Sequence, residues 1–185
     1  EPIEEYVRLR TQNKHYENIQ LNQKQNHFTI DNLKSNQLEI LATFTLPNEP
    51  TKLPSEFDIK VFVGQNQTPT IGYKVKEQVL FTDRTKSGSP DYNNSFLCVT
   101  NAELTLEGGT IQLRIFLDQS SVEVFANNGK VAMSNLIFPD PDQNQIYAYS
   151  VDDGEVTLSA LDTWVLDNIW REYGSSDKNG REIFS

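Results

Sequence analysis

The stretch that decides the fold is LRIFLDQSSVEVFANNGKVAMSNLIFPD, residues 113–140. Apolar and polar residues alternate along it in three runs, a pattern typical of strands that bury one face. The polar segment between the first two runs makes a tight turn if Gln119 and Ser120 are its central residues. Asn128-Gly129 is a strong hairpin signal, because both residues adopt positive φ readily. The stretch therefore predicts a three-stranded meander.

The predicted turns determine which residues lie opposite one another. They pair Leu117 with Val122 and Arg114 with Phe125 across the first turn, and Ala126 with Val131 across the second. One face of the meander is then apolar and is predicted to face the core; it consists of Leu113, Ile115, Leu117, Val122, Val124, Ala126, Val131 and Met133. The opposite face carries Arg114, Phe116, Glu123, Phe125 and Ser134.

Two acids in this stretch, Asp118 and Glu123, raise the question of a glycosidase carboxylate pair. The predicted register places Glu123 diagonal to Arg114, within reach of a cross-strand ion pair. Asp118 lies at the turn, where a carboxylate accepts backbone N–H groups. No apolar pocket is evident that would raise the pKa of either acid. The pattern therefore favours structural roles for both.

Strand signals continue along the rest of the chain. We expect strands at 15–21, 26–30, 37–46, 57–64, 70–75, 78–83, 95–100, 111–118, 121–127, 130–138, 145–151 and 155–166. Clusters of turn-forming residues, such as Lys86-Ser87-Gly88-Ser89-Pro90 and Gly108-Gly109, separate them. Many short strands without crossover helices predict an all-β fold, either a sandwich or a barrel.

The ends of the chain differ from its middle. EPIEEYVRLR at 1–10 is predicted to be helical, because Pro2 suits a first helical position, acids follow it, and arginines end the segment. We expect a linker helix over 1–12, a sandwich over 13–168 and a polar C-terminal tail over 169–185.

Composition limits the classes of function. The 185 residues suit one large domain, and 16 basic against 26 acidic residues leave a net charge of −10. That charge excludes a basic, phosphate-tracking surface, so we expect no nucleic-acid partner. No apolar run reaches the roughly 18–20 residues that a membrane helix needs, so we expect no membrane partner. A neutral ligand such as a sugar remains open.

Residues that could carry metal or nucleophilic chemistry are few. His15 and His27 have no acid at metal-ligand spacing and are expected to be solvated or hydrogen-bonded. Asp140-Pro141-Asp142 and Asp152-Asp153-Gly154 lack the full spacing of a calcium loop and are interpreted as turns. Cys98, the single cysteine, is expected to be a small buried hydrophobe on a strand. We predict no metal and no cofactor.

Exposed aromatic rings could contact the C–H groups of a sugar. The candidates are Tyr73, Tyr92, Tyr147, Tyr149 and Trp170. Trp164 is instead expected to fill the core. Because isolated surface aromatics are common, we favour no sugar site over one. Asn66-Gln67-Thr68 and Asn93-Asn94-Ser95 are candidate glycosylation sites at Asn66 and Asn93, and they weakly favour secretion.

Three segments resemble a known family. LRIFLDQSSVEVFANNGKVAMSNLIFP at 113–139 closely resembles the signature of the C-terminal β-sandwich module of glycoside hydrolase family 32, which includes invertases, inulinases and levanases. FTDRTKSG at 81–88 is similar to the family's D-R-[ST]-x-S-G segment, and PIEEYVRLR at 2–10 to its linker helix. The resemblance spans residues 2 to about 166 in the family's order. It implies structural roles for the signature residues Asp83, Arg84, Arg114, Asp118, Glu123 and Phe125.

The resemblance also implies where the chemistry lies. In the family an N-terminal five-bladed propeller carries the catalytic acids, in W-M-N-D-P-N-G, E-C and R-D-P motifs. None of these motifs occurs in this sequence: Cys98 follows Leu97, and no arginine precedes Asp-Pro. We therefore expect no catalytic residue here. The implied function is that of a non-catalytic module bracing the propeller of a secreted β-fructosidase that acts on sucrose, inulin or levan without a cofactor.

Other interpretations remain open. A free-standing, lectin-like fructan binder is the main alternative, and an autonomous enzyme is disfavoured because every family catalytic motif is missing. The implied partners are the catalytic propeller, fructan and a second copy of the chain. Ile3, Tyr6 and Val7 follow i, i+3, i+4 spacing and would form an apolar stripe suited to such a contact.

Overall fold

The predicted meander forms three consecutive strands in the computed structural model: β8 (Thr110–Asp118), β9 (Ser121–Ala126) and β10 (Val131–Leu136). The Cα register pairs Leu117 with Val122, and Ala126 with Val131, which confirms the expected pairing. Asn128 and Gly129 have φ values of 57° and 81°. The hairpin therefore turns where residues that tolerate positive φ occur.

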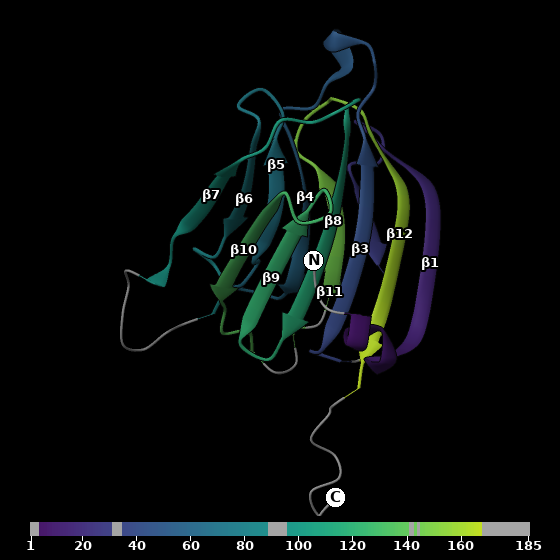
Figure 1. The fold of residues 1–185 in the computed structure, drawn as a ribbon. Coiled ribbons are helices and arrows are strands. Elements are labelled where there is room, and N and C mark those ends of the chain that lie inside the picture. The colour runs from purple at the N-terminus through teal and green to yellow at the C-terminus, as the bar shows by residue number, and fades with distance from the viewer. Residues whose placement is uncertain (1–3, 31–34, 89–95, 141–142, 144, 168–185) are drawn as a thin grey trace, which may run out of the picture.

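The meander belongs to a six-stranded sheet, called sheet 1, in the order β1-β12-β3-β8-β9-β10. Its other strands are β1 (Arg10–Leu21), β3 (Leu38–Thr45) and β12 (Val156–Leu166). Sheet 2 has the order β2-β11-β4-β5-β6-β7 and consists of β2 (His27–Ile30), β4 (Glu56–Val63), β5 (Thr70–Lys74), β6 (Val79–Asp83), β7 (Val99–Glu103) and β11 (Gln145–Ser150). The pairings are antiparallel and the two sheets stack as a sandwich (Figure 1). The structure describes residues 4–30, 35–88, 96–140, 143 and 145–167.

The expected strands all occur, but two of them are displaced. β1 begins at Arg10 rather than at residue 15, because it pairs with β12 from Arg10↔Leu166 to Leu21↔Val156. β7 begins at Val99 rather than at residue 95, since its pairing with β6 starts there. Both differences come from the pairing with a partner strand, which for β1 is distant in sequence.

The N-terminal helix ends at Leu9 rather than at residue 12 as expected. It is a 3-10 helix, η1 (Glu4–Leu9), and the strand β1 follows at once. A second short 3-10 helix, η2 (Pro50–Lys52), lies between β3 and β4. In the part of the chain that the structure describes, no helix is long and apolar enough to cross a membrane.

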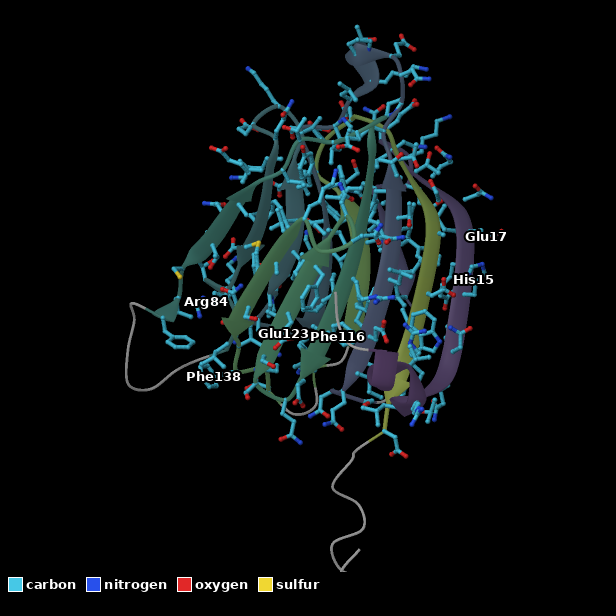
Figure 2. All side chains as sticks on the ribbon, in the orientation of Figure 1. His15, Glu17, Arg84, Phe116, Glu123 and Phe138 are labelled. Carbon is cyan, nitrogen blue, oxygen red and sulfur yellow. The ribbon has the colours of Figure 1, made fainter. Side chains whose placement is uncertain are left out.

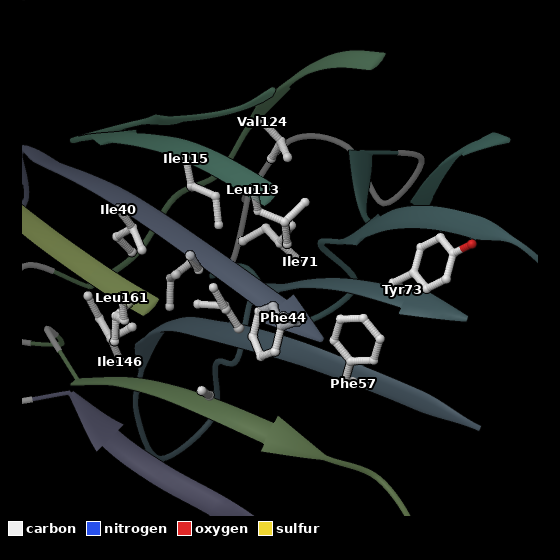
Figure 3. Packing of buried hydrophobic residues seen from close by; sticks show 14 of the residues in the cluster. Ile40, Phe44, Phe57, Ile71, Tyr73, Leu113, Ile115, Val124, Ile146 and Leu161 are labelled. Carbon is white, nitrogen blue, oxygen red and sulfur yellow. The ribbon is translucent and has the colours of Figure 1, made fainter. Parts of the chain in front are cut away.

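The core lies between the two sheets, and most of its residues are aliphatic, with a group of aromatic rings packed among them (Figure 3). Phe44 and Phe57 have ring centroids 4.8 Å apart, and Phe57 and Tyr73 have centroids 5.8 Å apart. Tyr73 is only 1% exposed, and its hydroxyl donates to the carbonyl oxygen of Leu104 at 2.6 Å. Tyr73 is therefore a core residue, and its selection as a surface sugar contact was wrong.

Burial of the predicted core face agrees with expectation at nearly every position. Leu113, Ile115 and Val124 are buried, and Met133 is 7% exposed, whereas Val131 is half-buried at the margin of the core. The alternation of inward and outward residues therefore follows the predicted period of two.

Two other burial predictions were wrong. Trp164 is half-buried on the outer side of sheet 1, because it lies an odd number of residues from the buried Leu161. Cys98 is half-buried and precedes β7, so it does not fill the core. Its sulfur accepts a hydrogen bond from Nη2 of Arg84 at 3.1 Å.

Candidate interaction surface

A cluster of charged and aromatic side chains occupies the outer side of sheet 1. We call it the arginine–glutamate face and define it by Arg10, Glu39, Arg114, Phe116, Phe125 and Trp164. In the strand register Glu39 lies between Trp164 and Phe116, and Arg114 lies opposite Phe125. Since successive residues of a strand point to opposite sides, these positions alternate with the core residues Ile40 and Ile115.

Glu39 is the centre of this face. The Nε of Arg10 donates to its Oε2 at 2.8 Å and the Nη2 of Arg10 to its Oε1 at 2.6 Å. The Nε of Arg114 is 3.4 Å from the same Oε1. The hydrogen bond to Glu39 raises the pKa of Arg10. Glu39 is only 1% exposed, and two guanidinium groups compensate the cost of removing its carboxylate from water.

Aromatic rings complete the arginine–glutamate face. The Arg10 guanidinium lies 4.0 Å from the centroid of the Trp164 ring, a cation–π contact. Phe116 and Phe125 are half-buried and meet edge to face, with centroids 6.1 Å apart. Leu136 on β10, on the same outer side of sheet 1 and opposite Ser121 in the register, is 47% exposed. The surface is thus a mixture of apolar rings and already paired charges, suited to contact with another protein surface.

The N-terminal segment lies next to this surface. Figure 1 shows η1 beside the lower ends of β3 and β12, and the N–H of Asp167 donates to the carbonyl oxygen of Leu9 at 2.8 Å. Val7 within η1 is 50% exposed. Ile3 of the predicted apolar stripe lies outside the described residues, and the side chain of Tyr6 is not described.

Asp118 and Glu123, the two acids considered as a glycosidase pair, lie diagonally across β8 and β9 on the outer side of sheet 1, and both are exposed rather than enclosed in a cleft. Glu123 is exposed (Figure 2), and within the described ranges it makes no ion pair. The acid beside Arg114 is Glu39. The expected Arg114–Glu123 pair was therefore wrong. Oδ1 of Asp118 accepts the N–H of Gln119 at 2.7 Å, as expected of a turn acid.

Asp83 and Arg84 organise the turn after β6. Oδ1 of Asp83 accepts the N–H of Thr85 at 2.8 Å and its hydroxyl at 2.7 Å. The Arg84 guanidinium lies 4.7 Å from the centroid of the Phe96 ring and donates through Nη1 to the carbonyl of Leu136 at 3.4 Å. This turn therefore joins the edge of sheet 2 to the edge of sheet 1.

The described residues contain no group of three or more His, Cys, Asp or Glu side chains that could hold a metal ion. His15 contacts Glu17 at 3.0 Å and Asp162 at 2.7 Å, and these hydrogen bonds, first that of Glu17, raise the pKa of His15. Asp152 accepts the N–H groups of Ser55 and Gly154, as a turn residue does. Of Asp140-Pro141-Asp142, only Asp140 lies within the described ranges.

The remaining sugar-contact candidates lie on sheet 2 or outside the described residues. Tyr147 and Tyr149 are half-buried on β11, where the ammonium group of Lys60 covers the Tyr149 ring at 3.6 Å from its centroid. Tyr92, Trp170 and the candidate glycosylation site Asn93 lie outside the described residues. Asn66 is exposed in a bend between β4 and β5.

Fold and surface together define a two-sheet antiparallel β-sandwich domain with one organised outer face. The sequence profile described as "Glycosyl hydrolases family 32 C terminal" matches residues 5–165. The chain belongs to this family.

Relatives and solved structures agree with that assignment. The chain is 39% identical to a levanase of Bacillus sp. (strain L7) over 143 residues, which are 77% of this chain and 15% of that protein. It is 31% identical to a levanase of Bacillus subtilis (strain 168) over 170 residues, 91% of this chain and 24% of that protein. Both sequence identities are above 30%, but the chain spans less than a quarter of the length of either relative.

Two crystal structures are similar in fold. An exo-inulinase from Aspergillus awamori superposes with a TM-score of 0.73 at 22% identity, covering 89% of this chain and 31% of that one. Fructan 1-exohydrolase IIa from Cichorium intybus gives 0.77 at 16% identity, covering 91% and 38%. At these identities the likeness establishes the sandwich fold alone.

Proposed function

We propose that this chain is the non-catalytic C-terminal domain of an enzyme that hydrolyses terminal β-fructosides, and that it braces the catalytic domain of that enzyme. The observation that carries the proposal is the family match over residues 5–165, which spans the sandwich. The stretches that align with this chain make up only 15% and 24% of two levanases. Among the relatives are also exo-inulinases named as extracellular, which supports a secreted parent.

The placement of the acids supports a non-catalytic role. A glycosidase pair needs its two carboxyl groups about 5–9 Å apart on either side of a bound sugar. Here Asp118 is an exposed turn residue and Glu123 is exposed on a strand face. Neither arrangement offers the buried surroundings that would tune a carboxyl group into a general acid.

The arginine–glutamate face is the proposed contact with the catalytic domain. Arg10 belongs to this face and follows η1 directly in sequence, so a preceding domain in the same polypeptide would emerge beside it. The negative charge of Glu39 is already balanced by Arg10 and Arg114 of the same domain, so a partner need not supply a positive charge. Exposed Leu136 and the half-buried Phe116 and Phe125 offer apolar area, as interfaces between domains do.

The enzymatic part of the proposal is tested with the isolated chain and with its gene. The chain alone should release no fructose from sucrose or inulin, and W-M-N-D-P-N-G should be encoded upstream of Glu1 in the same reading frame. Fructose release that disappears on Asp118→Ala or Glu123→Ala would overturn the non-catalytic assignment.

The interface is tested in the longer protein. Phe116→Ser and Leu136→Ser should speed thermal inactivation of its fructosidase activity several-fold, since they remove apolar contact area. Tyr147→Ser, on the opposite sheet, is the matched control and should leave inactivation unchanged. Equal inactivation rates for all three variants would contradict this choice of interface.

A further inference from the structure

A pocket of about 310 Å³ opens at one end of the sandwich, where loops of both sheets meet. The register brings Leu38 beside Leu117 in sheet 1 and Val63 beside Gln145 in sheet 2, so the neighbouring loops share this end. The residues that line the pocket are Asn36, Phe62, Gln119, Pro139, Asp140 and Gln143. None of them belongs to the arginine–glutamate face.

The pocket wall is built around a buried side chain, Gln67. It is 2% exposed, its Nε2 donates to the carbonyl oxygen of Phe62 at 3.0 Å, and its Oε1 accepts the N–H of Asp140 at 3.0 Å. One amide therefore ties the end of β4 to the loop that follows β10. A buried amide that is bonded through both its nitrogen and its oxygen holds both walls in one arrangement.

Phe62 adopts an uncommon backbone conformation at this place. Its φ is 48°, in the left-handed region that bulky residues rarely occupy. The register of β4 against β11 shifts between Gln145 and Tyr147, a β-bulge at which Val61 and Phe62 are both buried. The Phe62 side chain is 1% exposed and belongs to the core, although the residue borders the pocket.

The absence of a side chain at Gly64 leaves room for the pocket wall that Gln143 forms. A Cβ at this position would lie 2.5 Å from Cδ and Oε1 of Gln143. The absence of a side chain at Gly64 thus allows the Gln143 amide to lie against the backbone. The N–H of Gln143 also donates to the carbonyl oxygen of Asp140 at 3.0 Å.

The chemistry of the lining indicates the class of ligand. Three amide side chains, Asn36, Gln119 and Gln143, each offer both donors and acceptors, as sugar hydroxyl groups require. Pro139 supplies an apolar part for ring C–H groups, and the Asp140 carboxylate can accept from neighbouring hydroxyls. Among the lining residues none is basic, which disfavours phosphate and other anions.

We propose that this pocket binds one residue of a neutral sugar, as a monosaccharide or as the end of an oligosaccharide. The volume is at the lower end of small-molecule sites, which suits a single sugar ring. The choice of fructose as the first sugar to test rests on the proposed function, whereas the pocket chemistry requires only a neutral polyhydroxylated ring.

The test is a titration of the ¹⁵N-labelled chain with fructose, sucrose, a short inulin oligosaccharide and glucose. Binding should shift the side-chain amide resonances of Asn36, Gln119 and Gln143. Gln143→Ala should weaken the binding at least tenfold. Gly64→Ala should do the same, because the new methyl group displaces Gln143 without disturbing a positive-φ residue.

Tyr147→Ser and Tyr149→Ser are the matched controls and should leave the affinity unchanged. Amide shifts confined to β11, or affinity lost in these two variants but kept in Gln143→Ala, would overturn the pocket assignment. So would the absence of pocket shifts with every sugar. Binding of glucose but not of fructose would support the pocket as a sugar site and contradict the choice of fructose as its ligand. No outcome of this titration depends on whether the gene encodes the catalytic domain upstream.

Discussion

Arg10 and Glu39 form a two-pronged ion pair across 29 positions of sequence, with donor–acceptor distances of 2.8 and 2.6 Å. The pair lies on the outer side of a sheet, yet the Glu39 side chain is only 1% exposed. Outer sheet faces normally present acids to water, where they need no partner. Because Glu39 is enclosed and paired with arginines, it organises the side chains on the outer side of sheet 1.

Removal of Arg10 should therefore destabilise the domain. Arg10→Met should lower the free energy of unfolding by about 2–4 kcal/mol, because Glu39 keeps only the longer contact to Arg114. Arg10→Met combined with Glu39→Leu should recover much of the loss, since no buried charge then remains unpaired. Urea unfolding of the two single variants and the double variant measures the coupling. Additive losses would show that the two side chains do not interact in solution.

Asp58 should make stability depend on pH. It is 2% exposed on β4, its Oδ1 has no hydrogen-bond partner among the described residues, and burial raises its pKa to about 7 despite Lys60 at 3.9 Å. The folded state thus binds this proton more tightly than the unfolded state, whose pKa is near 3.8. Its contribution is present in acid and is lost as pH rises toward and through about 7, by at most about 4 kcal/mol.

Asp58→Asn isolates that contribution. The variant should unfold at higher urea than the wild type above neutral pH, and the difference should shrink as pH falls toward about 4. Asp118→Asn, at an exposed turn, is the control and should follow the wild-type pH profile. His15 also has a raised pKa, so the comparison uses the difference between wild type and variant rather than the wild-type slope. A pH-independent difference would contradict the raised pKa of Asp58.

The meander register can be tested by two substitutions at adjacent positions. Val124→Asp places an unpaired carboxylate at a residue with no exposed surface and should unfold the domain at room temperature. Glu123→Gln should change stability by no more than about 0.5 kcal/mol, because Glu123 is exposed. Thermal unfolding followed by circular dichroism compares them. Equal melting temperatures for wild type and Val124→Asp would show that the strand faces are assigned the wrong way round.

Two tyrosines allow a matched test of a buried hydroxyl. Tyr73→Phe should cost about 1–2 kcal/mol, because the carbonyl of Leu104 loses its donor inside the core. Tyr147→Phe removes a hydroxyl that donates to Oε1 of Gln145 at the surface and should cost a few tenths of a kcal/mol. Chemical unfolding of both variants is the measurement. Similar losses would contradict the burial of Tyr73.

The sequence alone determined the meander and its register. Period-two alternation and the Asn128-Gly129 turn act over a few neighbouring residues, so they specify local pairing without knowledge of the rest of the fold. The same local signals predicted that all the strands occur, although the beginnings of β1 and β7 were misplaced, and the signature at 113–139 indicated the family that the profile match then established. Tyr73 could also have been assigned correctly, because it shares a strand face with Ile71.

Only the tertiary structure decided which distant strands became neighbours. β3 lies beside β8, so Arg114 meets Glu39 rather than Glu123, although the single acid in the apolar run 37–46 was a visible signal. β12 lies between β1 and β3, so Arg10 reaches both Glu39 and Trp164. The pocket likewise gathers loops from both sheets. Long-range pairing and packing between sheets choose these contacts, and no local periodicity contains that information.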